Sequence, residues 1–335
     1  MHKSRATAEV EAALRAAEDD TLPPAERAEM LMQIAIGLQT RPKSPDELHQ
    51  AIALYERARD LAGDADLLFA ARIDARLGTA LQALPSEDGA PLLQARKQFE
   101  AARPVLEADG RPEEVAELLM NIGLCLQSLA ALHKAPIGDA IKAYQEALRT
   151  FDRTQYPKEY AILQNNLATA FLSIPFTDEH GKMREALAVQ SFEDGLSVVN
   201  LIDHPSEYAM LQNNLGNALQ YASSAHPVAN NLRALEAYDE ALKVRRPETT
   251  PIEYANTIAN KANCLANLPD DPARPERGGE GSVQAALLLY AEAKAIFERH
   301  GDRGKASVVA GAMAELDASA GANGSSRDLL SGEMS

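Results

Sequence analysis

Four asparagines recur at helical spacing toward the C-terminal end of the sequence: Asn256, Asn260, Asn263 and Asn267. Their separations of 4, 3 and 4 residues place the four carboxamides on one face of an α-helix. Asparagine is a mediocre helix former and a poor core residue, so this stripe needs a chemical reason. A carboxamide can bond both the N–H and the C=O of another backbone. The stripe therefore indicates a surface that binds polar groups without distinguishing side chains.

Residue types that catalyse reactions are not grouped in this sequence. No HExxH, GxSxG or CxxC pattern occurs, and GGEGS lacks the spacing of a phosphate-binding loop. Asp178, Glu179 and His180 are adjacent and could ligate a metal, but adjacent polar loop residues are more often solvated. Cys125 and Cys264 are too few and too far apart for a disulfide framework. We expect no metal, no cofactor and no enzymatic activity.

Composition and charge restrict the partners. The chain has 335 residues, is 46% hydrophobic and carries a formal net charge of −16. Such an acidic protein is a poor ligand for nucleic acid or an anionic membrane, since both attract cationic surfaces. The sequence also shows no apolar run of membrane length and no hydrophobic signal segment at its N-terminus. We expect a cytoplasmic protein without nucleic-acid or membrane partners.

The asparagine stripe belongs to a segment that occurs six times. Three copies are close: YPKEYAILQNNLATAF from Tyr156, HPSEYAMLQNNLGNAL from His204 and TPIEYANTIANKANCL from Thr250. Looser copies begin at Pro23, Leu67 and Arg111. All six have a small residue at one shared position, which we call the anchor: Ala35, Gly78, Gly123, Ala168, Gly216 and Ala262. A repeat of this kind predicts stacked supersecondary units.

A second helix follows each copy, with an aromatic residue flanked by small ones. The six aromatics are Tyr55, Phe99, Tyr144, Phe192, Tyr238 and Tyr290. Small residues let two helices approach closely, and the ring fills the space beside them. Strand signals are nearly absent, so the predicted class is all-α. Since one pair cannot bury its own apolar face, the pairs must stack into an α-solenoid.

These marks resemble the tetratricopeptide repeat (TPR) family, in the long-repeat variety found in kinesin light chains and bacterial signalling arrays. The resemblance implies one right-handed solenoid over residues 1–317, with six helix pairs between about 24 and 299. Capping helices are expected over about 3–20 and 305–317, and the Gly/Ser-rich residues 318–335 are expected to be disordered. The units exceed the usual 34 residues, mainly through loops at 174–183 and 268–282.

In this family the first helix of each pair lines a concave groove. The resemblance implies that the residue two before each anchor points into it, which gives Gln33, Arg76, Asn121, Asn166, Asn214 and Asn260. The groove would also include Arg72, Asn213, Asn217, Tyr221, Asn256, Asn263 and Asn267. The asparagines would form a ladder along an extended peptide backbone. Arg72 and Arg76 would receive an acidic group, with Glu29 and Glu117 nearby. The family's carboxylate clamp is incomplete, because Glu117, Ile162 and Met210 stand where lysine is wanted.

Two kinds of function fit this reading. The first is a non-enzymatic scaffold whose groove binds an extended segment of a partner protein. The second is a regulatory peptide or protein sensor that acts in trans on a separate effector, such as a protease, an ATPase or a transcription regulator. An enzyme is the less favoured third class. Beside the ladder stands a structural interpretation, in which the asparagines bond to neighbouring helices and bind no ligand.

Overall fold

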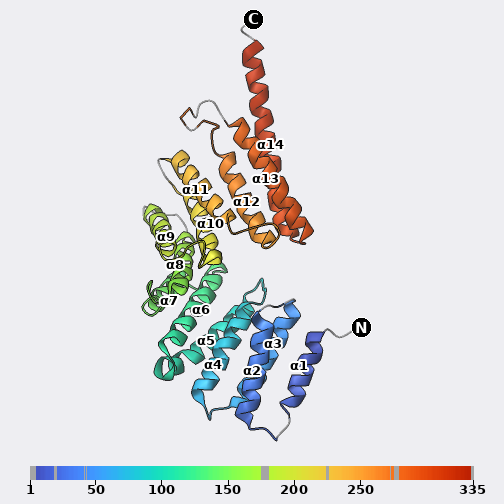
Figure 1. Ribbon diagram of the computed structural model, residues 1–335, viewed down its shortest axis with the longest axis vertical. Coiled ribbons are helices and arrows are strands. Elements are labelled where there is room, and N and C mark those ends of the chain that lie inside the picture. Colours follow the sequence, from blue (N-terminus) through green and yellow to red (C-terminus); the bar gives the residue numbers. More distant parts are fainter. Residues whose placement is uncertain are drawn as a thin grey trace. The chain divides into compact units, whose positions relative to one another are not determined.

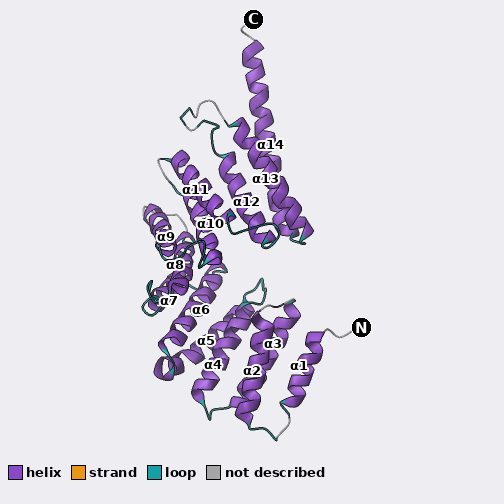
Figure 2. Cartoon of the chain, in the orientation of Figure 1, coloured by secondary structure: helices purple, strands orange, loops and turns teal. Residues whose placement is uncertain are grey.

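The computed structural model describes residues 5–18, 21–40, 42, 44–174, 181–223, 226–271, 273–274 and 279–332. Over this part of the chain every regular element is a helix and no strand occurs (Figures 1 and 2). Two compact units divide the chain, Met1–Gln155 and Tyr156–Ser335. The sequence analysis had expected a single domain over residues 1–317. The boundary falls between the third and fourth helix pairs.

Unit 1 contains one leading helix and three helix pairs (Figure 1). Its helices are α1 (Arg5–Ala16), α2 (Pro24–Thr40), α3 (Pro45–Ala62), α4 (Leu67–Gln82), α5 (Ala90–Asp109), α6 (Pro112–Ala131) and α7 (Ile137–Ala147). The pairs are α2 with α3, α4 with α5 and α6 with α7, and the helix α1 packs on the first pair. The first helices α2, α4 and α6 also contact one another in that order.

Unit 2 repeats this plan and ends in a long helix (Figure 1). Its helices are α8 (Pro157–Leu172), α9 (Gly181–Leu196), α10 (Pro205–Tyr221), α11 (Pro227–Leu242), α12 (Pro251–Ala266), α13 (Glu280–Arg299) and α14 (Arg303–Gly332). Consecutive helices pair as in unit 1, the first helices α8, α10 and α12 lie in contact, and α14 packs on α13. The prediction of an all-α solenoid built from helix pairs is confirmed.

Prolines begin the first helix of most pairs. In α6, α8, α10 and α12 the first helical residue is proline, and a glutamate lies in the first turn. Proline suits this position because its missing N–H would have no partner in the helix. The glutamate is favourable because the N-terminus of a helix carries a partial positive charge. These signals fix where the first helices of the pairs start.

The six aromatic rings of the second helices lie in the core, and none is more than 3% exposed: Tyr55, Phe99, Tyr144, Phe192, Tyr238 and Tyr290. Their predicted burial is confirmed. Glycine anchors make room for them. A Cβ atom at Gly123 would lie 2.3 Å from the ring of Tyr144, and one at Gly216 would lie 2.6 Å from that of Tyr238. Those distances are far shorter than van der Waals contact, so each ring occupies the space that a Cβ atom would need.

Two helices differ from the expectations. The last helix, α14, runs from Arg303 to Gly332, whereas the sequence analysis ended it at residue 317 and expected disorder beyond. The segment after Arg303 contains no proline and is rich in alanine, the best helix former, so no strong stop signal interrupts it. The first helix is shorter than expected and spans Arg5–Ala16 rather than residues 3–20.

Within the described residues one helix, α6, has the length and apolar composition that a membrane span needs. The sequence analysis had expected no such run. The helix packs between α5 and α7, and its buried residues include Leu118, Leu119 and Leu129. Its contacts with both neighbouring helices bury part of this apolar surface.

Candidate functional site

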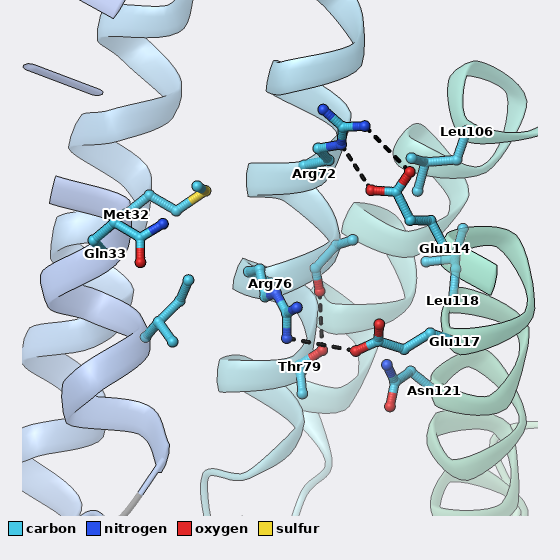
Figure 3. A pocket seen from close by; sticks show the side chains of 12 residues that line it. Met32, Gln33, Arg72, Arg76, Thr79, Leu106, Glu114, Glu117, Leu118 and Asn121 are labelled. Carbon is cyan, nitrogen blue, oxygen red and sulfur yellow. Dashed lines mark hydrogen bonds and ion pairs between the residues drawn. The ribbon is translucent and has the colours of Figure 1, made fainter. Parts of the chain in front are cut away.

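A pocket of about 230 Å³ opens on the first helices of unit 1, α2, α4 and α6 (Figure 3). Its floor is apolar and is formed by Met32, Ile36, Ala75, Leu106 and Leu118. Polar side chains complete the lining: Gln33, Arg72, Arg76, Thr79, Glu114, Glu117 and Asn121. The predicted groove residues of unit 1 thus come together around one cavity. The register two residues before the anchor supplies one of them from each of the three helices.

Arg72 pairs with Glu114 at two points within this lining, and its side chain is 41% exposed. Its Nε donates to Glu114 Oε1 at 2.8 Å, and its Nη2 donates to Glu114 Oε2 at 3.2 Å (Figure 3). Glu114 also accepts from the main-chain N–H of Arg111 at 3.0 Å. The hydrogen bond from Arg72 is the main reason why the pKa of Glu114 falls to about 2. This two-point pairing fixes both side chains at one end of the pocket.

Arg76 lies one turn further along α4 and is held more loosely. Its Nη1 is 3.5 Å from Glu117 Oε1, and both side chains are 47% exposed (Figure 3). That separation is an ion pair rather than a hydrogen bond. Across the pocket Gln33 Nε2 donates to Glu29 Oε1 at 2.7 Å. The cavity therefore has one rigid ion pair and one loose ion pair.

The asparagines of unit 2 bond to one another across three helices. Asn260 Nδ2 of α12 donates to Asn213 Oδ1 of α10 at 3.3 Å. Asn213 Nδ2 donates to Asn214 Oδ1 at 3.0 Å, and Asn214 Nδ2 donates to Asn165 Oδ1 of α8 at 2.8 Å. In the last of these hydrogen bonds, Asn165 Nδ2 donates to Asn166 Oδ1 at 3.3 Å. We call these five residues the asparagine chain.

Burial separates the members of the asparagine chain. Asn165, Asn166 and Asn213 are each 7% exposed, whereas Asn214 and Asn260 are half-buried. Three carboxamides thus act mainly inside the protein, as the structural interpretation expected, and their mutual bonds satisfy groups that would be costly to bury alone. The exception is Asn166 Nδ2, which is buried without a hydrogen-bond partner. Of these five residues, only Asn214 and Asn260 are partly exposed.

The remaining predicted residues of unit 2 have varied surroundings. Asn217 Oδ1 accepts the hydroxyl of Tyr238 at 2.8 Å, and Asn263 Oδ1 accepts that of Tyr290. The exposed Asn267 donates to the carbonyl of Asn263 at 2.8 Å. Of the other two, Asn256 is half-buried and Tyr221 is 69% exposed. Asn263 of the stripe and Asn217 of α10 therefore each hold a core tyrosine.

Sequence reasoning missed a pairing between the core rings and a carboxamide four residues after the anchor. Tyr55 donates its hydroxyl to Gln39 Oε1 at 2.7 Å, and Tyr144 donates to Gln127 Oε1 at 2.8 Å. Tyr238 donates likewise to Gln220 Oε1 at 2.9 Å. The signal was present in the sequence, because a glutamine stands at this position in each of those repeats.

Groups capable of metal binding or nucleophilic chemistry do not gather in the described part of the chain. No cluster of three or more His, Cys, Asp or Glu side chains there could hold a metal ion, and Asp178, Glu179 and His180 lie outside the described residues. Burial raises the pKa of the Cys125 thiol to about 11 and that of Cys264 to about 12. Both thiols stay protonated near neutral pH, which makes them poor nucleophiles.

Comparison with known proteins gives similarity in structure alone. No family model and no curated protein matches the chain. The solved structure of the Rap conjugation gene regulator of the plasmid pLS20, in complex with the Phr* peptide, matches with a TM-score of 0.51 and 13% identity, covering 95% of this chain and 86% of that one. BtubC (BKLC) from P. vanneervenii matches with a TM-score of 0.49 and 20% identity, covering 72% and 89%. Similarity to the Rap regulator at this identity shows a shared all-α repeat fold.

Proposed function

We propose that this chain is a non-enzymatic interaction protein, and that the pocket on α2, α4 and α6 binds an extended segment of a partner protein. One observation carries the proposal: three consecutive first helices direct groups from the same register into one cavity of about 230 Å³. An apolar floor with a few hydrogen-bonding groups at its rim is typical of a ligand site. The Rap regulator, which has the same kind of fold, was solved in complex with a peptide.

We propose a narrower form of the asparagine ladder. Asn121 lines the pocket of unit 1 and is half-buried. On unit 2, Asn214 and Asn260 are half-buried, and each uses its Nδ2 to bond one neighbour. A carboxamide nitrogen carries two N–H groups, so each asparagine has a second one to offer to a peptide carbonyl. The proposed ladder is therefore mainly a row of donors.

A regulatory sensor is the second candidate. The structural neighbour that carries a peptide is described as a conjugation gene regulator, which favours a chain that binds a peptide and then acts in trans on a separate effector. The net charge of −16 supports a protein partner over nucleic acid or an anionic membrane. We also propose a cytoplasmic location. The two candidates differ in whether occupancy of the pocket changes the binding of a second protein.

A plug in the pocket tests the proposal. The full chain would be immobilised and used to capture proteins from lysate of the source organism, with cross-linking to identify the contact residues. Ala75 lines the pocket, and Ala75→Phe should fill the cavity and abolish capture. The control is Ala101→Phe, at an exposed position of α5. Capture that survives the plug with unchanged cross-links, in a variant that melts normally, would exclude this pocket as the binding site.

A further inference from the structure

We infer that the pocket on α2, α4 and α6 selects a segment with a carboxylate side chain beside an apolar residue, and that Arg76 reads the carboxylate by exchanging Glu117 for it. The inference rests on the proposed function, since it names what the same pocket takes. It assigns different roles to Arg72 and Arg76, which the sequence analysis had treated alike. Arg76 becomes the specificity-determining residue, and Arg72 becomes a structural one.

Arg72 is not the residue that binds the partner's carboxylate, because it is already paired with Glu114. Two hydrogen bonds, at 2.8 and 3.2 Å, join it to Glu114. That carboxylate is only 17% exposed and is also bonded by the main chain of Arg111. A ligand would have to break a two-point charge-assisted pairing and leave Glu114 partly buried without its partner, which is costly.

Arg76 has no such commitment to its partner. Its contact with Glu117 is 3.5 Å long, and both side chains are 47% exposed, so the pair is worth little in water. A partner carboxylate offering two-point geometry would be a better ligand than Glu117.

The lining of the pocket favours an anion over a cation. A guanidinium carries five N–H donors, and the carboxamide of Asn121 adds two more. Of the two acidic groups in the lining, Glu114 is bound by Arg72, and Glu117 pairs loosely with Arg76. Beside these donors lies the floor of Met32, Ile36 and Leu118, which suits an apolar neighbour of the acidic residue.

The test uses three synthetic heptapeptides with acetylated and amidated ends, so that no terminal charge takes part. Each has a central residue between two leucines, and this residue is glutamate, glutamine or lysine. Binding to the full chain would be measured by titration with NMR detection at low salt. We expect the glutamate peptide to bind about tenfold more tightly than the glutamine peptide, and the lysine peptide to bind most weakly.

Three variants give results of different sign. Arg76→Gln should remove the preference for glutamate. Glu117→Gln should raise the affinity for the glutamate peptide by about twofold to fivefold, because it deletes the competing carboxylate. Arg72→Gln should lower the melting temperature. The matched control is Arg96→Gln, at an arginine of α5 that pairs with Glu100 outside the pocket lining, and it should leave the preference unchanged. Each variant would be titrated well below its own melting temperature.

Contrary outcomes are separable. Equal binding of the three peptides, no binding of any, a preference for lysine, or weaker glutamate binding in Glu117→Gln would overturn the inference. The Ala75→Phe plug then shows what else fails. If the plug still abolishes capture of proteins from lysate, the proposed function stands and only the carboxylate is wrong. If the plug changes nothing, the proposed function fails as well.

Discussion

At the scale of the residue, the core rings and the carboxamides show how one hydroxyl decides whether a buried polar group is satisfied. The repeat with Phe99 keeps glutamine at the paired position, and Gln82 Oε1 is buried with no hydrogen-bond partner. The repeat with Phe192 has leucine there, at Leu172. The apolar ring of Phe192 therefore has an apolar partner, whereas the ring of Phe99 leaves the Gln82 carboxamide without a hydrogen bond.

This mismatch predicts a stabilising substitution. Phe99→Tyr should supply the hydroxyl that Gln82 lacks and raise the free energy of unfolding by about 0.5–1.5 kcal/mol. The control is Phe192→Tyr, whose new hydroxyl would face Leu172 and should destabilise the protein by about 1–3 kcal/mol. Urea unfolding of both variants measures the difference. Two changes of the same sign would contradict the pairing.

The ion pair of Arg72 and Glu114 predicts a pH dependence. The folded-state pKa of Glu114, about 2, lies below its ordinary value of 4.5. A depressed carboxylate pKa stabilises the folded state above the ordinary value, and this stabilisation is lost as the pH falls from about 4.5 toward 2. Glu114→Gln should therefore cost about 1–2 kcal/mol at pH 7, after allowance for solvent screening.

The same comparison at low pH provides the check. The difference in unfolding free energy between the wild type and Glu114→Gln should shrink steadily between pH 4.5 and pH 2. Denaturant titrations at several pH values would follow it. A difference that is constant with pH would mean that Glu114 acts through packing and not through its charge.

Single-residue partners were only partly predictable. The register of the repeat singled out Gln33, Arg76 and Asn121, and all three line one cavity. It could not assign Glu114 to Arg72, because these residues are 42 apart in sequence and their pairing depends on side-chain rotamers. The same limit applies to the asparagine chain, where neighbouring carboxamides of equal chemistry divide into buried and accessible members.

At the scale of the element, the glycine anchors couple helix approach to ring size. Gly123→Ala would place a Cβ 2.3 Å from the ring of Tyr144. Overpacking of this kind typically costs about 1–3 kcal/mol, which should exceed the gain of about 1 kcal/mol from the better helix propensity of alanine. We expect Gly123→Ala to lower the melting temperature.

A second glycine on a first helix isolates the propensity term. A Cβ at Gly37 of α2 would meet no atom within 4 Å. Gly37→Ala should therefore raise the unfolding free energy by about 0.5–1 kcal/mol. Calorimetry on the two variants compares them directly. A stabilised Gly123→Ala would imply that the ring of Tyr144 can move aside at no cost.

Helix boundaries followed the strength of their signals. Starts marked by proline and glutamate, as in α8 and α10, lie where the sequence indicated. The end of α14 had no such mark, and the glycines and serines after residue 317 were interpreted as a stop. Side chains up to Leu316 pack against the core of the last pair. The predicted capping segment, residues 305–317, therefore matches the part of α14 that packs, but not the point where the helix ends.

At the scale of the whole molecule, the repeat predicted six helix pairs but not their division into two compact units. Sequence similarity between the copies reflects the packing of the two helices within a pair, because this packing is the same in every copy. It does not report how strongly consecutive pairs contact each other, because those residues vary from copy to copy. The fourth copy begins at Tyr156, the first residue of unit 2, and the sequence gives no composition change there.

The asparagine chain should make its stability contribution within unit 2. Asn214→Ala removes the partner of both Asn165 Oδ1 and Asn213 Nδ2, which belong to α8 and α10. Leaving buried polar groups unpaired costs about 1–3 kcal/mol, more than the gain in helix propensity. Hydrogen exchange should therefore speed up in α8, α10 and α12 while α2 to α7 keep their protection. Uniform loss over both units would mean that they unfold together.

Peptide affinity measured below the melting temperature separates the two roles of Asn214. If binding is unchanged while unit 2 is destabilised, its carboxamide serves only the fold, and the proposed ladder loses that member.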